Sequence, residues 1–211
     1  PAPFQIEENV DADENTRLKY RYLDLRRPNI SNNFILKSDT TMMIRKFFHN
    51  RNFVDIETPY LSKSTPEGAR DYLVPSRINK KHFYALPQSP QILKQILMTS
   101  GFDRYYQIVR CFRDEDLRSD RQPEFTQIDF EMSFVNQDDV MSTVEELLEI
   151  IFDNIKGIKL SRPFKQITFK ESMDKYGNDR PDVRFGLEFN DVTDLFRQTK
   201  FKVFKDVIDK N

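Results

Sequence analysis

The sequence predicts an α+β fold, in which helices pack on an antiparallel β-sheet. Residues 127–134, QIDFEMSF, alternate strictly between polar and apolar side chains, the pattern of a strand with one buried face. A second strand over residues 106–115 precedes it, and the loop between them favours antiparallel pairing. Residues 31–53 and 138–157 carry helical patterns, so two long helices are available to cover the sheet.

The N-terminal elements follow from local signals. Residues 1–16 combine proline with acidic residues and show no periodicity, so they are expected to form a linker. A helix is predicted over residues 14–25, ending before Pro28. Ser31 is expected to cap the long helix that follows. The next strand ends at Pro59, because proline cannot donate to a central ladder.

A shorter helix is predicted after Ser89, its expected N-cap, with Pro90 at the first helical position and Gly101 beyond the end. Its expected apolar face consists of Ile92, Leu93, Ile96 and Leu97. Its other face is expected to hold Gln91, Lys94, Gln95 and Met98. After residue 157 the pattern predicts short strands that alternate with turns.

The composition argues against several classes of protein. A formal net charge of −1 gives no global positive field, although a local basic patch would suffice to bind nucleic acid. Cys111 is the only cysteine, which rules out an internal disulfide and favours a reducing compartment. It lies in an apolar run, so a buried side chain is favoured over a nucleophile. Because His49 and His82 lack metal-ligand spacing and no signal peptide or membrane span is evident, we expect a cytoplasmic protein without a metal site.

Arg113 and Glu115 are the first candidates for chemistry. None of the five glycines forms a phosphate-binding loop, so any phosphate contact must come from side chains. Arg113, at the end of a strand, suits this role because guanidinium groups bind phosphate oxygens through two hydrogen bonds. Glu115 shares its face and could orient a neighbouring donor. For any one residue, however, the pattern alone favours a solvated cross-strand ion pair.

Other polar positions leave two interpretations open. Gln91 and Lys94 lie one turn apart near a helix N-terminus and together could bind a carboxylate, whereas a single exposed lysine is usually only solvated. Glu67 either binds an ammonium group or lies in a turn at a helix start. Phe125 either stacks on a nucleobase or belongs to the core.

Five long blocks of the sequence occur in the order and register of a known protein family. The blocks are RYLDLRRP, FVDIETPYLSKSTPEGARDY, FYALPQSPQILKQILM, GFDRYYQIVRCFRDEDLRSDRQPEFTQIDFEMSF and YGNDRPDVRFGLE. They resemble the aspartyl-tRNA synthetases of bacterial or organellar type, and the resemblance extends from about Asp13 to Phe204. It implies a class II synthetase catalytic core, with an antiparallel sheet flanked by helices, that dimerises through the segment ending at Pro59.

The resemblance also implies roles for individual residues. Arg113 would be the catalytic residue, holding the α-phosphate of ATP and the substrate carboxylate. The residues expected to bind aspartate are Glu67, Ser89, Gln91, Lys94, Arg113, Gln127 and Asp129. The residues expected to bind ATP are Arg113, Asp114, Glu115, Gln122 and Phe125. Glu67 would take the α-ammonium group and Lys94 the side-chain carboxylate, so Lys94 and Arg113 should converge on one ligand.

By the same resemblance the partners are ATP, L-aspartate and tRNA(Asp), whose acceptor end would meet residues 116–123. Residues 1–16 are expected to be a linker from a missing anticodon-binding domain, residues 17–196 part of the catalytic domain, and residues 197–211 the start of an inserted domain. The glycine-rich third motif and the acidic residues that hold Mg²⁺ in the family are absent. We therefore expect this chain alone to be inactive.

Two alternatives stay open. One is a paralogue that adenylates aspartate but does not act on tRNA, and flanking sequence would separate it from a tRNA ligase. The other is a non-catalytic synthetase-like binding module, which predicts damage at the pocket positions. The pocket positions that match the family motif are Glu67, Gln91, Lys94, Arg113 and Glu115.

Overall fold

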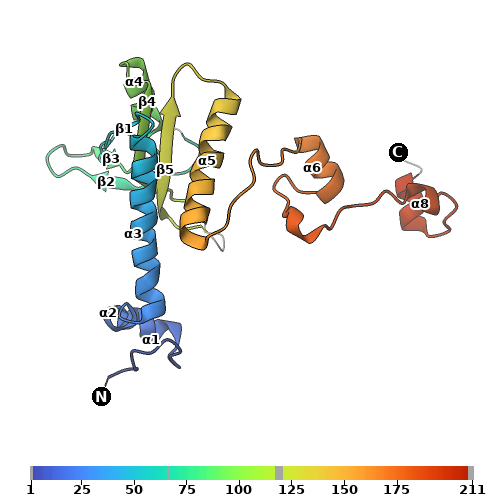
Figure 1. Cartoon of the computed structure of the whole chain (residues 1–211), viewed down its shortest axis with the longest axis horizontal. Coiled ribbons are helices and arrows are strands. Elements are labelled where there is room, and N and C mark those ends of the chain that lie inside the picture. Colours follow the sequence, from blue (N-terminus) through green and yellow to red (C-terminus); the bar gives the residue numbers. More distant parts are fainter. Residues whose placement is uncertain (1, 66, 117–120, 209–211) are drawn as a thin grey trace. The chain divides into compact units, whose positions relative to one another are not determined.

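A computed structural model describes residues 2–65, 67–116 and 121–208 of the chain (Figure 1). The chain divides into two compact units, residues 1–162 and 163–211. The first unit contains the sheets. Its helices are α1 (Glu14–Lys19), α2 (Arg21–Asp24), α3 (Pro28–His49), α4 (Gln91–Thr99) and α5 (Gln137–Lys156).

The main sheet has the strand order β1-β4-β5 within the described residues. Its strands are β1 (Val54–Asp55), β4 (Arg104–Phe112) and β5 (Glu124–Met132). The predicted antiparallel pairing is confirmed for β4 and β5, which pair over their whole length with Gln107 opposite Asp129. β1 pairs with β4 in parallel, because the chain crosses over through β2, β3 and α4 before returning. The sheet is therefore mixed rather than purely antiparallel, within a fold of mixed helix and strand content.

A second, two-stranded sheet pairs β2 (Leu73–Pro75) with β3 (Phe83–Ala85) in antiparallel fashion. Figure 1 shows this hairpin beside the main sheet. A backbone bridge between Ser62 and Ala85 ties its base to the segment that follows β1. The crossover is thus an ordered part of the first unit.

One face of the main sheet carries the hydrophobic core. Tyr106 of β4 and Phe130 of β5 lie on this face, and Phe48 of α3 packs on both rings. Its ring stacks on Tyr106 at a centroid distance of 4.8 Å and meets Phe130 at 5.3 Å. Leu147 of α5 completes the cluster. Helices α3 and α5 therefore cover the same face of the sheet (Figure 1).

The helix boundaries correct two predictions. The α3 helix begins at Pro28, so the N-cap is Arg27 and not Ser31. Proline suits the first helical position because its fixed φ fits a helix. It also has no backbone N–H group, and an N–H group at this position would have no acceptor within the helix. The helix predicted over residues 14–25 is present but is interrupted at Tyr20, which separates α1 from α2. The α5 prediction is confirmed, with Asn136 in a capping box and Gly157 ending the helix at φ 64°.

The N-terminal segment is attached to the corner between α2 and α3. The Arg27 guanidinium donates to the backbone carbonyls of Glu7 at 2.8 Å and Glu8 at 2.5 Å. It also pairs with the fully buried carboxylate of Asp24 at 2.8 Å. Phe4 is buried. The segment predicted as a linker is therefore held against the first unit through its backbone.

The second unit is helical in its described part. Its elements are α6 (Phe169–Tyr176), the 3₁₀ helix η1 (Val183–Phe185), α7 (Thr193–Phe196) and α8 (Lys202–Ile208). The short strands predicted after residue 157 are wrong for residues 158–208, which contain no strand. Gly177 ends α6 at φ 63°, and a Cβ there would lie 2.7 Å from the Phe189 ring, so glycine is required. Across the described residues, no helix is long and apolar enough to cross a membrane.

The aromatic cluster generates a stability prediction. Phe48→Ala should lower the free energy of unfolding by about 3–5 kcal/mol, because a fully buried ring leaves a cavity among its neighbours. The matched control is Phe83→Ala in β3, where the ring is 58% exposed and the loss should be about 1 kcal/mol or less. Urea unfolding of the chain at pH 7 measures both. Equal losses for the two variants would contradict this description of the core.

Candidate substrate-binding site

The face of the main sheet opposite the core is polar. Because side chains alternate along each strand, Tyr105 and Gln107 of β4 share this face with Gln127, Asp129 and Glu131 of β5. The alternation of polar and apolar residues in β5 was predicted, with the apolar face as the buried one. In the structure, burial does not follow that division. Asp129 is 7% exposed, whereas Ile128 on the other face is 40% exposed. The polar face is therefore an interior surface of the protein.

Lys94 brings a positive charge to this face from α4. Its Nζ lies 2.9 Å from Oδ1 of Asp129 and 3.2 Å from Oε2 of Glu131. The predicted apolar face of α4 is only partly covered, because Leu93 and Leu97 are half-buried while Ile92 and Ile96 are exposed. The buried residue of the helix is Lys94, which was expected on the other face. The reason is that α4 packs against a sheet face that carries carboxylates, so the ammonium group turns inward.

Burial and charge compete at this ion pair. Desolvation raises the pKa of Asp129 above its ordinary value, even though Lys94 donates to it. Desolvation acts to lower the pKa of Lys94, but the hydrogen bonds and charges of Asp129 and Glu131 outweigh it, so that pKa is raised. The second carboxylate oxygen of Asp129, Oδ2, is buried and has no hydrogen-bond partner among the described residues. The site thus holds an acceptor that a ligand's donor could satisfy.

Glu131 was missed as a site residue. The signal was present, because it shares its parity along β5 with Gln127 and Asp129, which were both assigned. Thr58 was also missed, and nothing in its sequence context distinguishes it. Its hydroxyl donates to Oε1 of the buried Gln107 at 3.0 Å, and the Tyr105 hydroxyl donates to the same atom at 2.9 Å. These bonds hold the Gln107 side chain on the polar face of the sheet, beside Asp129, which lies opposite Gln107 in the strand pairing.

Gln127 is held by the single cysteine. Sγ of Cys111 donates to Oε1 of Gln127 at 3.2 Å. This contact uses the side-chain amide oxygen of Gln127 and not its amide nitrogen. The prediction that Cys111 is buried is confirmed. Burial raises the pKa of this thiol to about 11, so it remains protonated at neutral pH and acts as a donor.

Arg113 and Phe125 lie together at the end of the strand pair. The Arg113 guanidinium is 5.1 Å from the centroid of the Phe125 ring, within the range of a cation–π contact. The backbone amide of Arg113 donates to the carbonyl of Pro123 at 2.9 Å, which fixes the position immediately after β4. Arg113 is half-buried, whereas Lys94 is buried. The structure places both on the polar side of the sheet, with separate partners.

The remaining nucleotide candidates lie nearer to solvent. Glu115 pairs with Arg121 at 3.5 Å, a partly exposed ion pair of the kind that the pattern alone favoured. Asp114 makes a backbone bridge with Arg70, which connects the end of β4 to the loop that carries Glu67. Gln122 is exposed. Within the predicted tRNA-facing loop, residues 117–120 lie outside the described residues.

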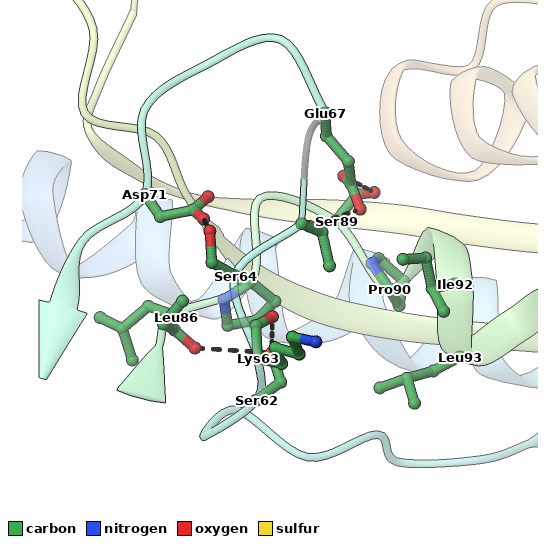
Figure 2. Close-up of a pocket in the computed structure, with 13 residues that line it drawn as sticks. Ser62, Lys63, Ser64, Glu67, Asp71, Leu86, Ser89, Pro90, Ile92 and Leu93 are labelled. Atoms are coloured by element: carbon green, nitrogen blue, oxygen red, sulfur yellow. Dashed lines mark hydrogen bonds between the residues drawn. The ribbon is translucent and has the colours of Figure 1, made fainter. Parts of the chain in front are cut away.

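Glu67 and Ser89 line a cavity of about 360 Å³ (Figure 2). The Ser89 hydroxyl donates to Oε2 of Glu67 at 2.6 Å, and the Thr65 hydroxyl donates to Oε1 at 3.1 Å. Ser89 is not the N-cap of α4, which is Pro90, but its Oγ accepts from the Gln91 amide at 3.3 Å. The Gln91 side chain is exposed. Lys94, Asp129 and Arg113 do not line this cavity.

The candidate site residues carry groups of both charges. Glu67 offers a carboxylate for a cationic group, while Lys94 and Arg113 offer positive charge for anionic groups. The described residues contain no cluster of three His, Cys, Asp or Glu side chains that could hold a metal ion. Asp129 and Glu131 are instead occupied by Lys94. This arrangement suits a small zwitterionic or anionic ligand.

Comparison of the sequence with known proteins shows the family to which the chain belongs. Residues 13–205 match the family described as "tRNA synthetases class II (D, K and N)". The chain is 60% identical over 210 residues to the aspartate–tRNA ligase of Staphylococcus haemolyticus, a match that covers 99% of this chain and 36% of that protein. It is 59% identical to the aspartate–tRNA(Asp/Asn) ligase of Thermodesulfovibrio yellowstonii, covering 100% of this chain and 35% of that protein. The chain thus spans about a third of the length of these relatives.

The buried ion pair generates a prediction. Lys94→Met should lower the free energy of unfolding by about 3–5 kcal/mol at pH 7, because it leaves the Asp129 carboxylate buried without its countercharge. Asp129→Asn in the Lys94→Met background should recover much of that loss. Urea unfolding of both variants measures the effect. If the double variant is no more stable than the single one, the pair does not carry the stability assigned to it.

The pH dependence of Lys94→Met supplies a second measurement. The folded-state pKa of Asp129 lies above its unfolded value, so its ionisation costs stability. That cost is absent below the unfolded pKa and grows as pH rises through the folded-state pKa. Removing Lys94 raises the folded-state pKa further, so the variant should lose stability relative to the unsubstituted protein as pH rises above the unfolded-state pKa of Asp129. A parallel pH profile for the two proteins would contradict this.

Proposed function

Because the chain belongs to the class II tRNA synthetases of the D, K and N group, we propose that it forms part of an aspartate–tRNA ligase. The observation that carries the proposal is the buried Lys94 ammonium group, held against the carboxylates of β5 on the polar face of the sheet. A site for a small dianionic amino acid needs such a fixed cation. Relatives with that activity in their names are about 60% identical over nearly all of this chain.

The proposed reaction has two steps. The α-carboxylate of aspartate attacks the α-phosphorus of ATP, giving aspartyl-adenylate and releasing pyrophosphate. A hydroxyl at the 3′ end of tRNA(Asp) then attacks the activated carbonyl, giving aspartyl-tRNA and releasing AMP. Neither step needs a protein nucleophile, so positioning and positive charge supply the catalysis. This requirement agrees with a protonated, buried Cys111.

In this proposal the aspartate subsite uses both charge types. Glu67 binds the α-ammonium group with Ser89 and Gln91 beside it, and Lys94 binds the side-chain carboxylate. Gln127 and Asp129 complete the pocket, where the unpartnered Oδ2 of Asp129 is available to a donor of the substrate. Asparagine would leave Lys94 without the added charge, so the same lysine discriminates between the two amino acids.

Arg113 joins the two subsites as the proposed catalytic residue. Its guanidinium would bind the α-phosphate of ATP and the attacking carboxylate, stabilising the charge that develops between them. Phe125, whose ring contacts the Arg113 guanidinium in the present structure, would stack on the adenine ring. Asp114, Glu115 and Gln122 would complete the ATP subsite.

The Mg²⁺ that we propose for the full-length enzyme would be held by residues outside this chain. Mg²⁺ prefers carboxylate and phosphate oxygens in octahedral geometry. Asp129 and Glu131 are paired with Lys94, and Glu115 with Arg121. We therefore assign no metal ligand among the described residues.

We propose further that the protein acts in the cytoplasm as a homodimer through α3 and the segment ending at Pro59. Support comes from apolar side chains of α3 that remain exposed in the single chain. They are Phe34, Ile35, Leu36 and Met42. Ile35→Glu in the full-length protein should shift the sedimentation profile toward monomer, because a charge in a buried interface is costly. The control Asp39→Asn alters charge on the same helix, and an unchanged profile for Ile35→Glu would place the interface elsewhere.

Two alternatives have distinct signatures. A paralogue that only adenylates would show aspartate-dependent ATP–pyrophosphate exchange but no transfer to tRNA(Asp). A non-catalytic binding module would show neither. The site residues retained here, among them Glu67, Lys94 and Arg113, favour the ligase over the non-catalytic module.

The decisive experiment is amino-acid-dependent ATP–pyrophosphate exchange by the full-length protein. Aspartate should support exchange and asparagine should support far less, while the isolated 211-residue chain should be inactive. Arg113→Ala should reduce exchange by about 10²–10³-fold, as loss of a group that stabilises developing charge does elsewhere. Exchange with asparagine as good as with aspartate would overturn the assignment of substrate. Transfer of radiolabelled aspartate to tRNA(Asp) tests the second step.

A further inference from the structure

The loop that carries Glu67 is closed at its base. The Ser64 hydroxyl donates to the Asp71 carboxylate, so the two ends of segment 64–71 are joined (Figure 2). Figure 2 shows Glu67 at the far end of this loop with its carboxylate directed toward Ser89. Between them, Gly68 adopts φ 98°, a conformation that is readily accessible only to glycine. Within the loop, the Thr65 hydroxyl holds Oε1 of Glu67, so the contact that holds Oε2 and the backbone after Glu67 must come from elsewhere.

Gln88 supplies an anchor from outside the loop. Its side chain is 1% exposed, and its Oε1 accepts from the Ala69 amide at 3.1 Å. Its Nε2 donates to the Ala69 carbonyl at 2.8 Å and also to the Asp71 carboxylate. The side-chain amide thus pairs with both backbone groups of one residue, as a neighbouring strand would. Such a buried amide is costly to leave unpaired, which makes the contact specific.

Gln88 and Ser89 hold the loop at two successive points. Ala69 follows Glu67 by two residues, and the residue after Gln88 is the one that donates to the Glu67 carboxylate. The backbone of the loop and the carboxylate of Glu67 are therefore both hydrogen-bonded to the dipeptide Gln88-Ser89, which precedes α4. That dipeptide also leads directly into the helix that carries Lys94.

We propose that Gln88 is a positioning residue, whose side-chain amide sets where the Glu67 carboxylate lies and thereby how tightly the site holds the ammonium group of an amino acid. The inference rests on the proposed function, because it assigns Glu67 to the substrate's ammonium group. It concerns aspartate binding, because the side-chain hydrogen bonds of Gln88 go to Ala69 and Asp71 and not to Arg113 or Phe125.

The test uses Gln88→Glu in the full-length protein. This variant keeps the size of the side chain and one acceptor, but it loses both donors and places a second carboxylate beside Asp71. The KM for aspartate in ATP–pyrophosphate exchange should rise at least about tenfold, while the KM for ATP changes less than about twofold. Gln88→Ala should show the same split without the added charge. The matched control is Gln95→Glu, at an exposed position of α4.

Hydrogen exchange supplies a readout that does not depend on activity. In Gln88→Ala, exchange of the segment around Ala69 should become faster, while the amides of β4 and β5 keep their protection. Faster exchange throughout the sheet would mean that Gln88 supports the whole fold, and it would overturn the inference. An unchanged KM for aspartate would overturn it as well. If the unsubstituted protein shows no aspartate-dependent ATP–pyrophosphate exchange, the proposed function and this inference are overturned together.

Discussion

The antiparallel register between β4 and β5 is the constraint on which the rest of the first unit depends. It places Tyr106 and Phe130 on one face, where Phe48 packs on both, and Gln107 and Asp129 on the other. A shift of one residue would exchange these faces, burying carboxylates under α3 and turning aromatic rings toward α4. The hydrophobic core and the candidate site are therefore two consequences of a single pairing.

Much of this arrangement could be predicted because strand periodicity is local. The alternation from Gln127 to Phe134 was sufficient to put Gln127 and Asp129 on a common face, and parity placed Arg113 with Gln107. What could not be predicted was which face is covered. The burial of Asp129 depends on α4, which is distant in sequence and contributes Lys94 to the carboxylates. The periodicity of α4 did not predict that Lys94 would be its buried residue, because a helical pattern of apolar residues carries no information about an ion pair with another element.

The resemblance to a family contributed where residue patterns left two interpretations open. Glu67, Ser89 and Phe125 each had a purely structural explanation, and in the structure Glu67 contacts Ser89 and Phe125 contacts Arg113. Glu115 contacts Arg121 in a partly exposed ion pair. The ligand-binding roles of all four residues stay predictions. The residues that support the site, such as Thr58 and Gln88, carried no pattern of their own because their partners lie dozens of positions away or on backbone atoms.

The attachment of the N-terminal segment by Arg27 has a consequence for how sequence can vary there. Arg27 binds the main-chain oxygens of Glu7 and Glu8, and Asn29 adds a further bond to the carbonyl of Glu8 at 3.1 Å. Main-chain oxygens are present whatever amino acids occupy those positions. The side chains at 7 and 8 can therefore change while the segment keeps its place. The residues whose identity fixes the path of the segment are those at the α2–α3 corner, which supply the hydrogen-bond donors.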